Sequence, residues 1–239
     1  DSASRGLGDV YKRQLKNGVN VISLSATPIP RTLNLSLSKV RDISLITTPP
    51  TGRKSVKTIV SRYSKSLVFE AIQREFYRDG QVFYLLNNVS MLEEKKKEIS
   101  DRFPGKKIAF AHGQLRPKEL SKVMESFIRK EIDLLVCTTI IESGIDIENA
   151  NTLIVEESEN YGLSQLHQIR GRVGRSKREA YAYFFLNENK KLKNKASERI
   201  EALQENESLL SGFSLAMRDL EIRGAVSYTH LTLPTKEGV

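Results

Sequence analysis

Short apolar segments alternate with amphipathic helical segments through the middle of the chain. Segments with the apolar, β-rich composition of strands are 57–63, 81–87, 107–112, 132–139, 151–157 and 180–186. Helical periodicity covers about 65–78, 90–102, 117–130 and 163–170. This alternation predicts an α/β fold, with a mainly parallel sheet covered by helices. Ligands of such sheets bind beyond the carboxyl ends of the strands, where we expect the unusual residues to gather.

The composition describes a folded, moderately basic protein. Of the 239 residues, 38 are Lys or Arg and 29 are Asp or Glu, which gives a net charge of +9 and favours an acidic partner without identifying one. No apolar run approaches the roughly 20 residues of a membrane helix, so we expect no membrane partner. The single cysteine, Cys137, excludes an internal disulfide and fits a reducing, cytoplasmic location. We expect it to be a small buried strand residue.

The two ends of the chain share an unusual property at the level of DNA. "DVYKRQ" (9–14) can be encoded by GATGTGTATAAGAGACAG. The reverse complement of that string, read in another frame, encodes "VSYTH" (226–230) and supplies the first base of a codon for Leu231, so it matches the start of "VSYTHL". The pair resembles the transposon-end adapter of sequencing libraries. We therefore expect residues 1–14 and 226–239 to be adapter read-through rather than native protein, which would make the remainder a fragment. The coding DNA tests this expectation directly.

Composition and turn signals divide the remaining chain into three parts. Residues 15–50 begin with a β-rich run at 19–26 and continue with a helical and a strand-like segment up to the linker signal "TTPPTGRKS". The alternating strands and helices occupy 51–190. The charged, helix-favouring stretch 191–225 contains "SG" at 211–212 as a break between two helices, and we interpret it as an appendage to the sheet domain.

Three stretches together resemble motifs III, V and VI of superfamily-2 nucleic-acid motors. They are "SATPIPRT" (25–32), "CTTIIESGIDI" (137–147) and "QLHQIRGRVGRS" (165–176), in the order and spacing of that family. The resemblance covers nearly all of 15–225 and implies that 51–190 form the second RecA-like lobe, the helicase C-terminal lobe. It also implies that 15–50 are the end of the first lobe and the linker.

The third stretch carries the arginines of the expected catalytic site. The resemblance implies that Arg172 and Arg175 are arginine fingers that reach across a cleft to the phosphates of ATP, with Gln168 also at the nucleotide. A guanidinium suits this role because it stays charged and donates several hydrogen bonds in a fixed fork. The alternative is a solvated basic turn, or a patch that meets the phosphates of nucleic acid.

The sequence lacks the other half of a nucleotide site. It has no GxxxxGK[ST] loop and no acidic pair upstream that would hold magnesium. The family places both in the first lobe. The resemblance therefore implies that ATP and Mg²⁺ are held mainly by a lobe absent here, and that the chain alone does not hydrolyse ATP.

The remaining candidate residues follow from the same resemblance. It implies nucleotide contacts for Gly144 and Asp146, and DNA-backbone contacts for His112, Gly113, Thr138 and Thr139. The bland alternatives are that the threonines reflect the β-propensity of a buried strand and that His112 is a structural hydrogen-bonding residue. Coupling between the ATP state and DNA contact is implied for Ser25, Ala26 and Thr27. The tail 212–225 resembles the start of a translocation-motif helical hairpin, in which Arg218 and Arg223 are coupling candidates or plain helix-surface charges.

Two families share most of these sequence stretches: transcription-repair coupling factors and RecG-like branch-migration helicases. "RDISLITTPPTGRKSVKT" and "VCTTIIESGIDIENANTLI" look closer to the coupling factors. That resemblance implies an ATP-dependent double-stranded DNA translocase that displaces stalled RNA polymerase and recruits excision-repair proteins, through domains absent here. A RecG-like enzyme that reverses stalled forks is the alternative within the enzyme class. A nucleic-acid-binding module without a nucleotide role is the alternative outside it.

Overall fold

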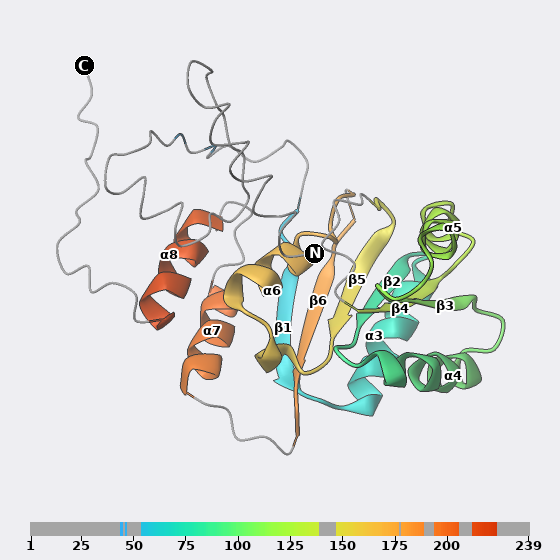
Figure 1. Ribbon diagram of the computed structural model, residues 1–239, viewed down its shortest axis with the longest axis horizontal. Helices are drawn as coiled ribbons and strands as arrows, with labels where there is room; N and C mark the ends of the chain where they lie inside the picture. The colour runs from blue at the N-terminus through green and yellow to red at the C-terminus, as the bar shows by residue number, and fades with distance from the viewer. Residues whose placement is uncertain are drawn as a thin grey trace, which may run out of the picture.

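The computed structural model describes residues 44, 46, 54–138, 147–176, 178–188, 194–205 and 212–223. Within them, six strands form one sheet in the order β1-β6-β5-β2-β4-β3, and every neighbouring pair is parallel (Figure 1). The strands are β1 (Lys57–Arg62), β2 (Gln81–Leu85), β3 (Ile108–Ala111), β4 (Leu134–Cys137), β5 (Ala150–Val155) and β6 (Tyr181–Leu186). The predicted α/β fold with a parallel sheet is confirmed.

Helices cover both faces of the sheet. On one face α3 (Lys65–Tyr77) and α4 (Leu92–Arg102) pack against the strands, and a 3₁₀ turn, η1 (Val89–Met91), leads into α4. On the other face lie α5 (Pro117–Ile128) and α6 (Leu163–Arg170), the latter preceded by the 3₁₀ turn η3 (Ser158–Asn160). The molecule therefore has three layers with one hydrophobic core on each side of the sheet (Figure 1).

Local sequence explains where these elements begin and how deeply they are buried. Ser64 caps α3 because its hydroxyl accepts a hydrogen bond from the Leu67 amide at 3.5 Å, and Pro117 suits the first turn of α5. All residues of β2, β4 and β5 are buried, as expected for central strands covered on both faces. Cys137 is 1% exposed in β4, so the prediction of a small buried strand residue is confirmed.

The last two helices are part of the same hydrophobic core. The predicted pair, with its break at 211–212, corresponds to α7 (Asn194–Glu205) and α8 (Gly212–Arg223). Ala202, Leu203 and Ile222 are buried in the cluster that also contains the apolar side of α6. The interpretation of this stretch as an appendage to the sheet domain stays a prediction. In the structure α7 and α8 lie beside α6 (Figure 1) and pack apolar side chains against it.

Parts of the chain fall outside the described residues. The strand expected at 19–26 and the helix after it lie there, as do both terminal segments. None of the described helices combines the length and apolar character needed to span a bilayer.

Candidate nucleotide and nucleic-acid sites

The motif VI turn, residues 171–176, packs closely against the beginnings of two strands. After α6 ends at Arg170, Val173 is fully buried and Gly174 has a φ of +75°. A Cβ atom on Gly174 would lie 2.8 Å from Cγ2 of Val56 and 3.1 Å from Cβ of Ala180. Both the backbone conformation and this close approach require glycine at the position. The turn is therefore fixed in place by packing as well as by its backbone.

This turn lies where the amino-terminal ends of the parallel strands meet, which is the amino edge of the sheet. The carboxyl edge is the opposite side, where the strands end. Val56 and Ala180 directly precede β1 and β6, and the Ser176 hydroxyl is 2.8 Å from Oδ1 of Asn151 near the start of β5. The expectation that the unusual residues gather at the carboxyl ends is wrong for motif VI. The chain leaves β5 at the carboxyl edge, and α6 returns it along the sheet to the opposite edge.

The two candidate arginine fingers emerge from this turn. Arg172 and Arg175 are both partly exposed, and Nε of Arg175 donates to the Gly171 carbonyl at 3.4 Å. The Arg172 amide donates to the Ile169 carbonyl at 3.0 Å, which continues the last turn of α6. Gln168 is exposed on the final turn of the same helix. The three predicted residues therefore share one short segment with a defined backbone, suitable for presenting positive charge to an anion.

Arg170, the neighbouring arginine of the same motif, has a structural role. It is only 5% exposed, and its guanidinium donates to the Leu203 carbonyl at 3.0 Å and to the Thr58 hydroxyl at 3.4 Å. Leu203 lies in the last turn of α7, where backbone carbonyls have no partner inside the helix. Arg170 thus caps α7 and joins it to α6 and β1.

A second polar contact joins α6 to α8. The Ser164 hydroxyl lies 3.5 Å from Oδ2 of Asp219, whose side chain is 1% exposed. Between these contacts, His167 on α6 is held in its neutral form. Burial lowers its pKa to about 4, and the positive charge of Arg170 acts in the same direction. Helix α6 is therefore bonded to both helices that follow the sheet.

The carboxyl edge carries the other candidates that the structure describes. His112 follows β3 and stacks on Phe110, with ring centroids 6.0 Å apart and planes 2° from parallel. Its Nδ1 atom is buried without a hydrogen-bond partner among the described residues. Thr138 follows β4, is 9% exposed, and donates its amide to the Ala111 carbonyl at 3.3 Å. Gly113 is exposed, with open space around the position of a Cβ atom.

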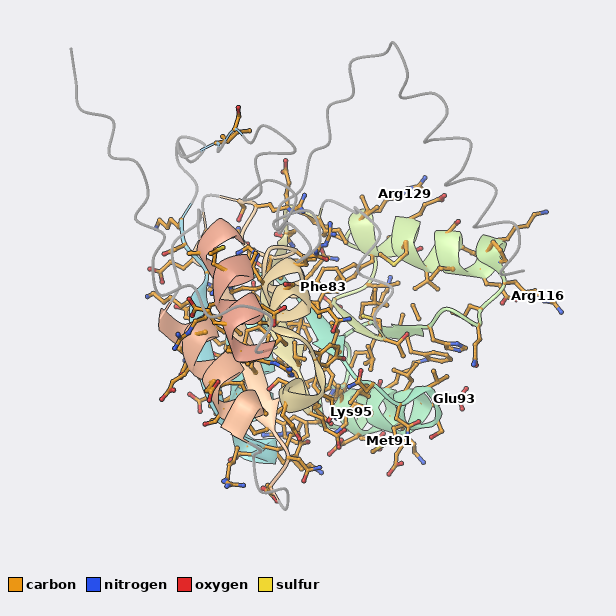
Figure 2. All side chains as sticks on the ribbon, turned by 60° about the vertical axis from the view of Figure 1, so that its left-hand side comes forward. Phe83, Met91, Glu93, Lys95, Arg116 and Arg129 are labelled. Carbon is orange, nitrogen blue, oxygen red and sulfur yellow. The ribbon has the colours of Figure 1, made fainter. Side chains whose placement is uncertain are left out.

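The carboxyl edge also holds a half-buried charge cluster that the sequence did not reveal. Nζ of Lys95 lies 3.1 Å from Glu156, 2.9 Å from Glu98 and 3.2 Å from the Tyr63 hydroxyl, and Tyr84 donates to Glu156. Burial lowers the pKa of Lys95, but the charge of Glu156 and the hydrogen bond to Glu98 outweigh it and raise the pKa. Figure 2 shows Lys95 near the start of α4, close to Met91 and Glu93. Lys95 is one of three successive lysines, so nothing local distinguished it.

Several predicted site residues lie outside the described part of the chain. They are Ser25, Ala26, Thr27, Thr139, Gly144 and Asp146. The backbone of Arg223 ends α8, and Arg218 is exposed with its guanidinium 2.9 Å from Glu221. The described residues contain no group of three or more His, Cys, Asp or Glu side chains that could hold a metal ion.

Known proteins share both the sequence and the fold of this chain. Residues 65–177 match the helicase conserved C-terminal domain. The transcription-repair-coupling factors of Staphylococcus haemolyticus and Staphylococcus epidermidis are 52% and 53% identical to the chain over 213 residues. These stretches cover 89% of the chain, and the chain spans 18% of the length of these curated relatives.

Solved structures agree with this likeness. A structure of RecG bound to a three-way DNA junction is 36% identical to this chain and superimposes with a TM-score of 0.70. The match covers 84% of this chain and 26% of the RecG chain. Saccharomyces cerevisiae Dbp5 bound to RNA and ADP-BeF₃ has a TM-score of 0.55 at 14% sequence identity. The match covers 85% of this chain and 54% of the Dbp5 chain, and at this identity it supports the fold alone. The chain therefore contains a RecA-like helicase C-terminal lobe, and over 89% of its length it is similar to transcription-repair-coupling factors.

Proposed function

We propose that this chain supplies the second RecA-like lobe, residues 51–190, of an ATP-dependent double-stranded DNA translocase. The α7–α8 pair would begin the hairpin that couples ATP turnover to movement on DNA, and residues 15–50 would end the first lobe. The whole protein would act in the cytoplasm, displace stalled RNA polymerase and recruit excision-repair proteins. The observation that carries the proposal is the motif VI turn, in which Gly174 and Val173 hold Arg172 and Arg175 in a fixed arrangement.

The described residues fit one side of a nucleotide site. Arg172 and Arg175 have the charge and the forked donor geometry to hold phosphate oxygens, and their rigid turn costs little reorganisation when an anion arrives. ATP, when bound, would supply the phosphoryl group that is transferred to water. By the resemblance to superfamily-2 motors, both Mg²⁺ and the phosphate loop would belong to the other lobe.

The contacts of α6 offer a path from the nucleotide to the hairpin. Arg170 joins the end of α6 to the end of α7, and Ser164 joins its beginning to Asp219 of α8. A displacement of the motif VI turn would therefore move α7 and α8 together with α6. His112, Gly113 and Thr138 at the opposite edge would meet the DNA backbone, so nucleotide and DNA would bind at different edges of one sheet.

The test uses the complete translocase that contains this chain. Arg172→Ala and Arg175→Ala should each lower DNA-stimulated ATP turnover by about 10³-fold or more, because each removes a charge that faces the transferring phosphoryl group. The dissociation constant for double-stranded DNA should change by less than about threefold. Arg129 is an exposed arginine directly after α5 (Figure 2), and Arg129→Ala is the matched control that should leave turnover unchanged. Loss of DNA affinity with normal turnover would instead favour the nucleic-acid-binding module.

A RecG-like enzyme is the second candidate. The 36% identity to RecG is compatible with it, although the 52% identity to coupling factors supports the first candidate better. The two enzymes act on different substrates, so parallel assays separate them. Release of a stalled RNA polymerase from its template by the complete protein, with no reversal of a model fork, supports the coupling factor. Efficient fork reversal without polymerase release would overturn that choice.

A further inference from the structure

A pocket of about 290 Å³ opens between the carboxyl-terminal ends of α3 and α4. Its lining residues come from the last turns of α3 and from the end of α4 with the turn that follows it: Gln73, Phe76, Tyr77, Arg102, Phe103, Pro104 and Lys106. The strands that follow these helices, β2 and β3, begin there, so the pocket lies at the amino edge on the α3–α4 face. His112 and Thr138 lie at the other edge, and the motif VI turn follows α6 of the other face.

The pocket combines an aromatic interior with a positively charged rim. Phe76 and Phe103 meet edge to face at 5.4 Å, and Tyr77 beside them is 81% exposed. Nζ of Lys106 lies 5.0 Å from the centroid of Phe76, and the Arg102 guanidinium lies 5.9 Å from that of Phe103. Among the described residues, no acidic side chain lines the pocket. Such a site suits a ligand that carries both an apolar group and negative charge.

The two cations differ in how far they are already neutralised. Lys106 lies 3.4 Å from Asp133, which takes up part of its charge. Arg102 is exposed and forms no ion pair with another described residue. Arg102 is therefore the rim cation best able to meet an incoming carboxylate, because a guanidinium pairs with carboxylates in a bidentate geometry.

We propose that this pocket docks an acidic peptide segment of a partner protein, with one aromatic or large aliphatic side chain seated against Phe76, Phe103 and Tyr77 and a flanking carboxylate on Arg102. The volume suits one large side chain rather than a folded surface. A nucleic-acid base fits less well, because Phe76 and Phe103 lie edge to face and already have cations near their rings, so they offer no flat platform for stacking. This proposal is independent of the function proposed above.

The first experiment titrates the full chain with a fluorescein-labelled peptide in which a single phenylalanine is flanked by aspartates. Amide resonances of Tyr77, Arg102, Phe103 and Lys106 should shift. Arg102→Glu and Tyr77→Ser should each weaken binding by about fivefold or more. Both side chains are exposed, so neither change should disturb folding. Arg116→Glu makes the same charge reversal on an exposed arginine at the start of α5 (Figure 2) and should bind the peptide as the unaltered chain does.

Three outcomes would overturn the proposal. Equal weakening by Arg116→Glu would mean that the peptide responds only to net charge. Equal affinity for a peptide with serine in place of phenylalanine would mean that the aromatic interior takes no part. Displacement of the peptide by a single-stranded oligonucleotide, with shifts at the same amides, would assign the pocket to nucleic acid. None of these results bears on ATP turnover by Arg172 and Arg175, so the two proposals fail separately.

Discussion

The two edges of the sheet hold their candidate site residues in different ways. At the amino edge, Gly174 is wedged between Val56 and Ala180, and Arg170 is buried beneath the turn. At the carboxyl edge, the turn after β3 is open, and a side chain at Gly113 would meet nothing within 4 Å. A group that stabilises a developing charge works best from a rigid support, whereas a group that follows a polymer backbone can tolerate movement. The difference therefore matches the two roles proposed for the edges.

The largest expected effect on stability comes from removing the buried arginine of the amino edge. Arg170→Ala should lower the free energy of unfolding by about 3 kcal/mol, because it leaves the Leu203 carbonyl without its donor and opens a cavity between α6 and α7. Urea unfolding of the full chain, followed by circular dichroism, measures the change. Arg129→Ala should alter stability by less than about 0.5 kcal/mol. Equal losses in the two variants would show that Arg170 does not hold the helices together.

A matched pair of glycine substitutions compares the two edges directly. Gly174→Ala should cost about 2 kcal/mol, because alanine is strained at a φ of +75° and its Cβ would press against Val56. Gly113→Ala should leave the free energy of unfolding nearly unchanged, since the space around it is open. Thermal and urea unfolding of both variants measure the difference. If both glycines tolerate alanine equally, the amino-edge turn is not more rigid than the other.

The third prediction concerns how the free energy of unfolding depends on pH through His167, which lies on α6 near the amino edge. The pKa of His167 is about 4 in the folded chain and about 6.5 in an unfolded one, so the unfolded state binds the extra proton first as the pH falls. Because of His167, the free energy of unfolding should therefore fall by about 1 kcal/mol when the pH is lowered from 7 to 5, after allowance for the partial exposure of the side chain.

The control for this prediction is His167→Gln, which removes the titrating group. Carboxylates contribute their own pH dependence in both proteins, so the quantity to compare is the difference in the free energy of unfolding between the two pH values. The loss should be smaller in His167→Gln than in the unaltered chain. An identical loss would place the pH sensitivity elsewhere.

The smallest effect is expected at the carboxyl edge. His112→Ala should weaken binding of double-stranded DNA by about threefold, as the loss of a single backbone contact does, with little change in stability. Fluorescence anisotropy with labelled duplex measures the affinity, and urea unfolding checks the fold. Unchanged DNA affinity together with a large loss of stability would make His112 the structural residue that its stacking on Phe110 also allows.

Local pattern was enough to predict most of the fold. The segments predicted as strands at 57–63 and 180–186 became β1 and β6 within a residue or two, and the helix predicted at 65–78 is Lys65–Tyr77. Apolar periodicity works here because each helix buries one face and each central strand both faces. The pairing order was not predicted, since strands that are neighbours in the sheet, such as β1 and β6, are far apart in the chain.

The candidate site was predicted less completely than the fold. The motif resemblance singled out Arg172 and Arg175 as site candidates, a prediction still to be tested, and it gave no role to Arg170, which is buried and caps α7. It also assigned the motif to the wrong edge of the sheet. Lys95 and Glu156 went unnoticed because their partnership joins the first turns of α4 to the end of β5, a contact that exists only after folding.

The sequence by itself determined the class of fold, the likeness to known nucleic-acid motors and the residue types available to meet phosphate, because periodicity and motif spacing are properties of short segments. Tertiary structure alone decided which of those residues are buried and which stay partly exposed. Arg170, Arg172 and Arg175 lie within six positions but differ in burial. Arg170 is buried between α6 and α7, whereas Arg172 and Arg175 are partly exposed at the amino edge. Burial depends on what packs from elsewhere in the chain, and that is settled only when the sheet and its helices come together.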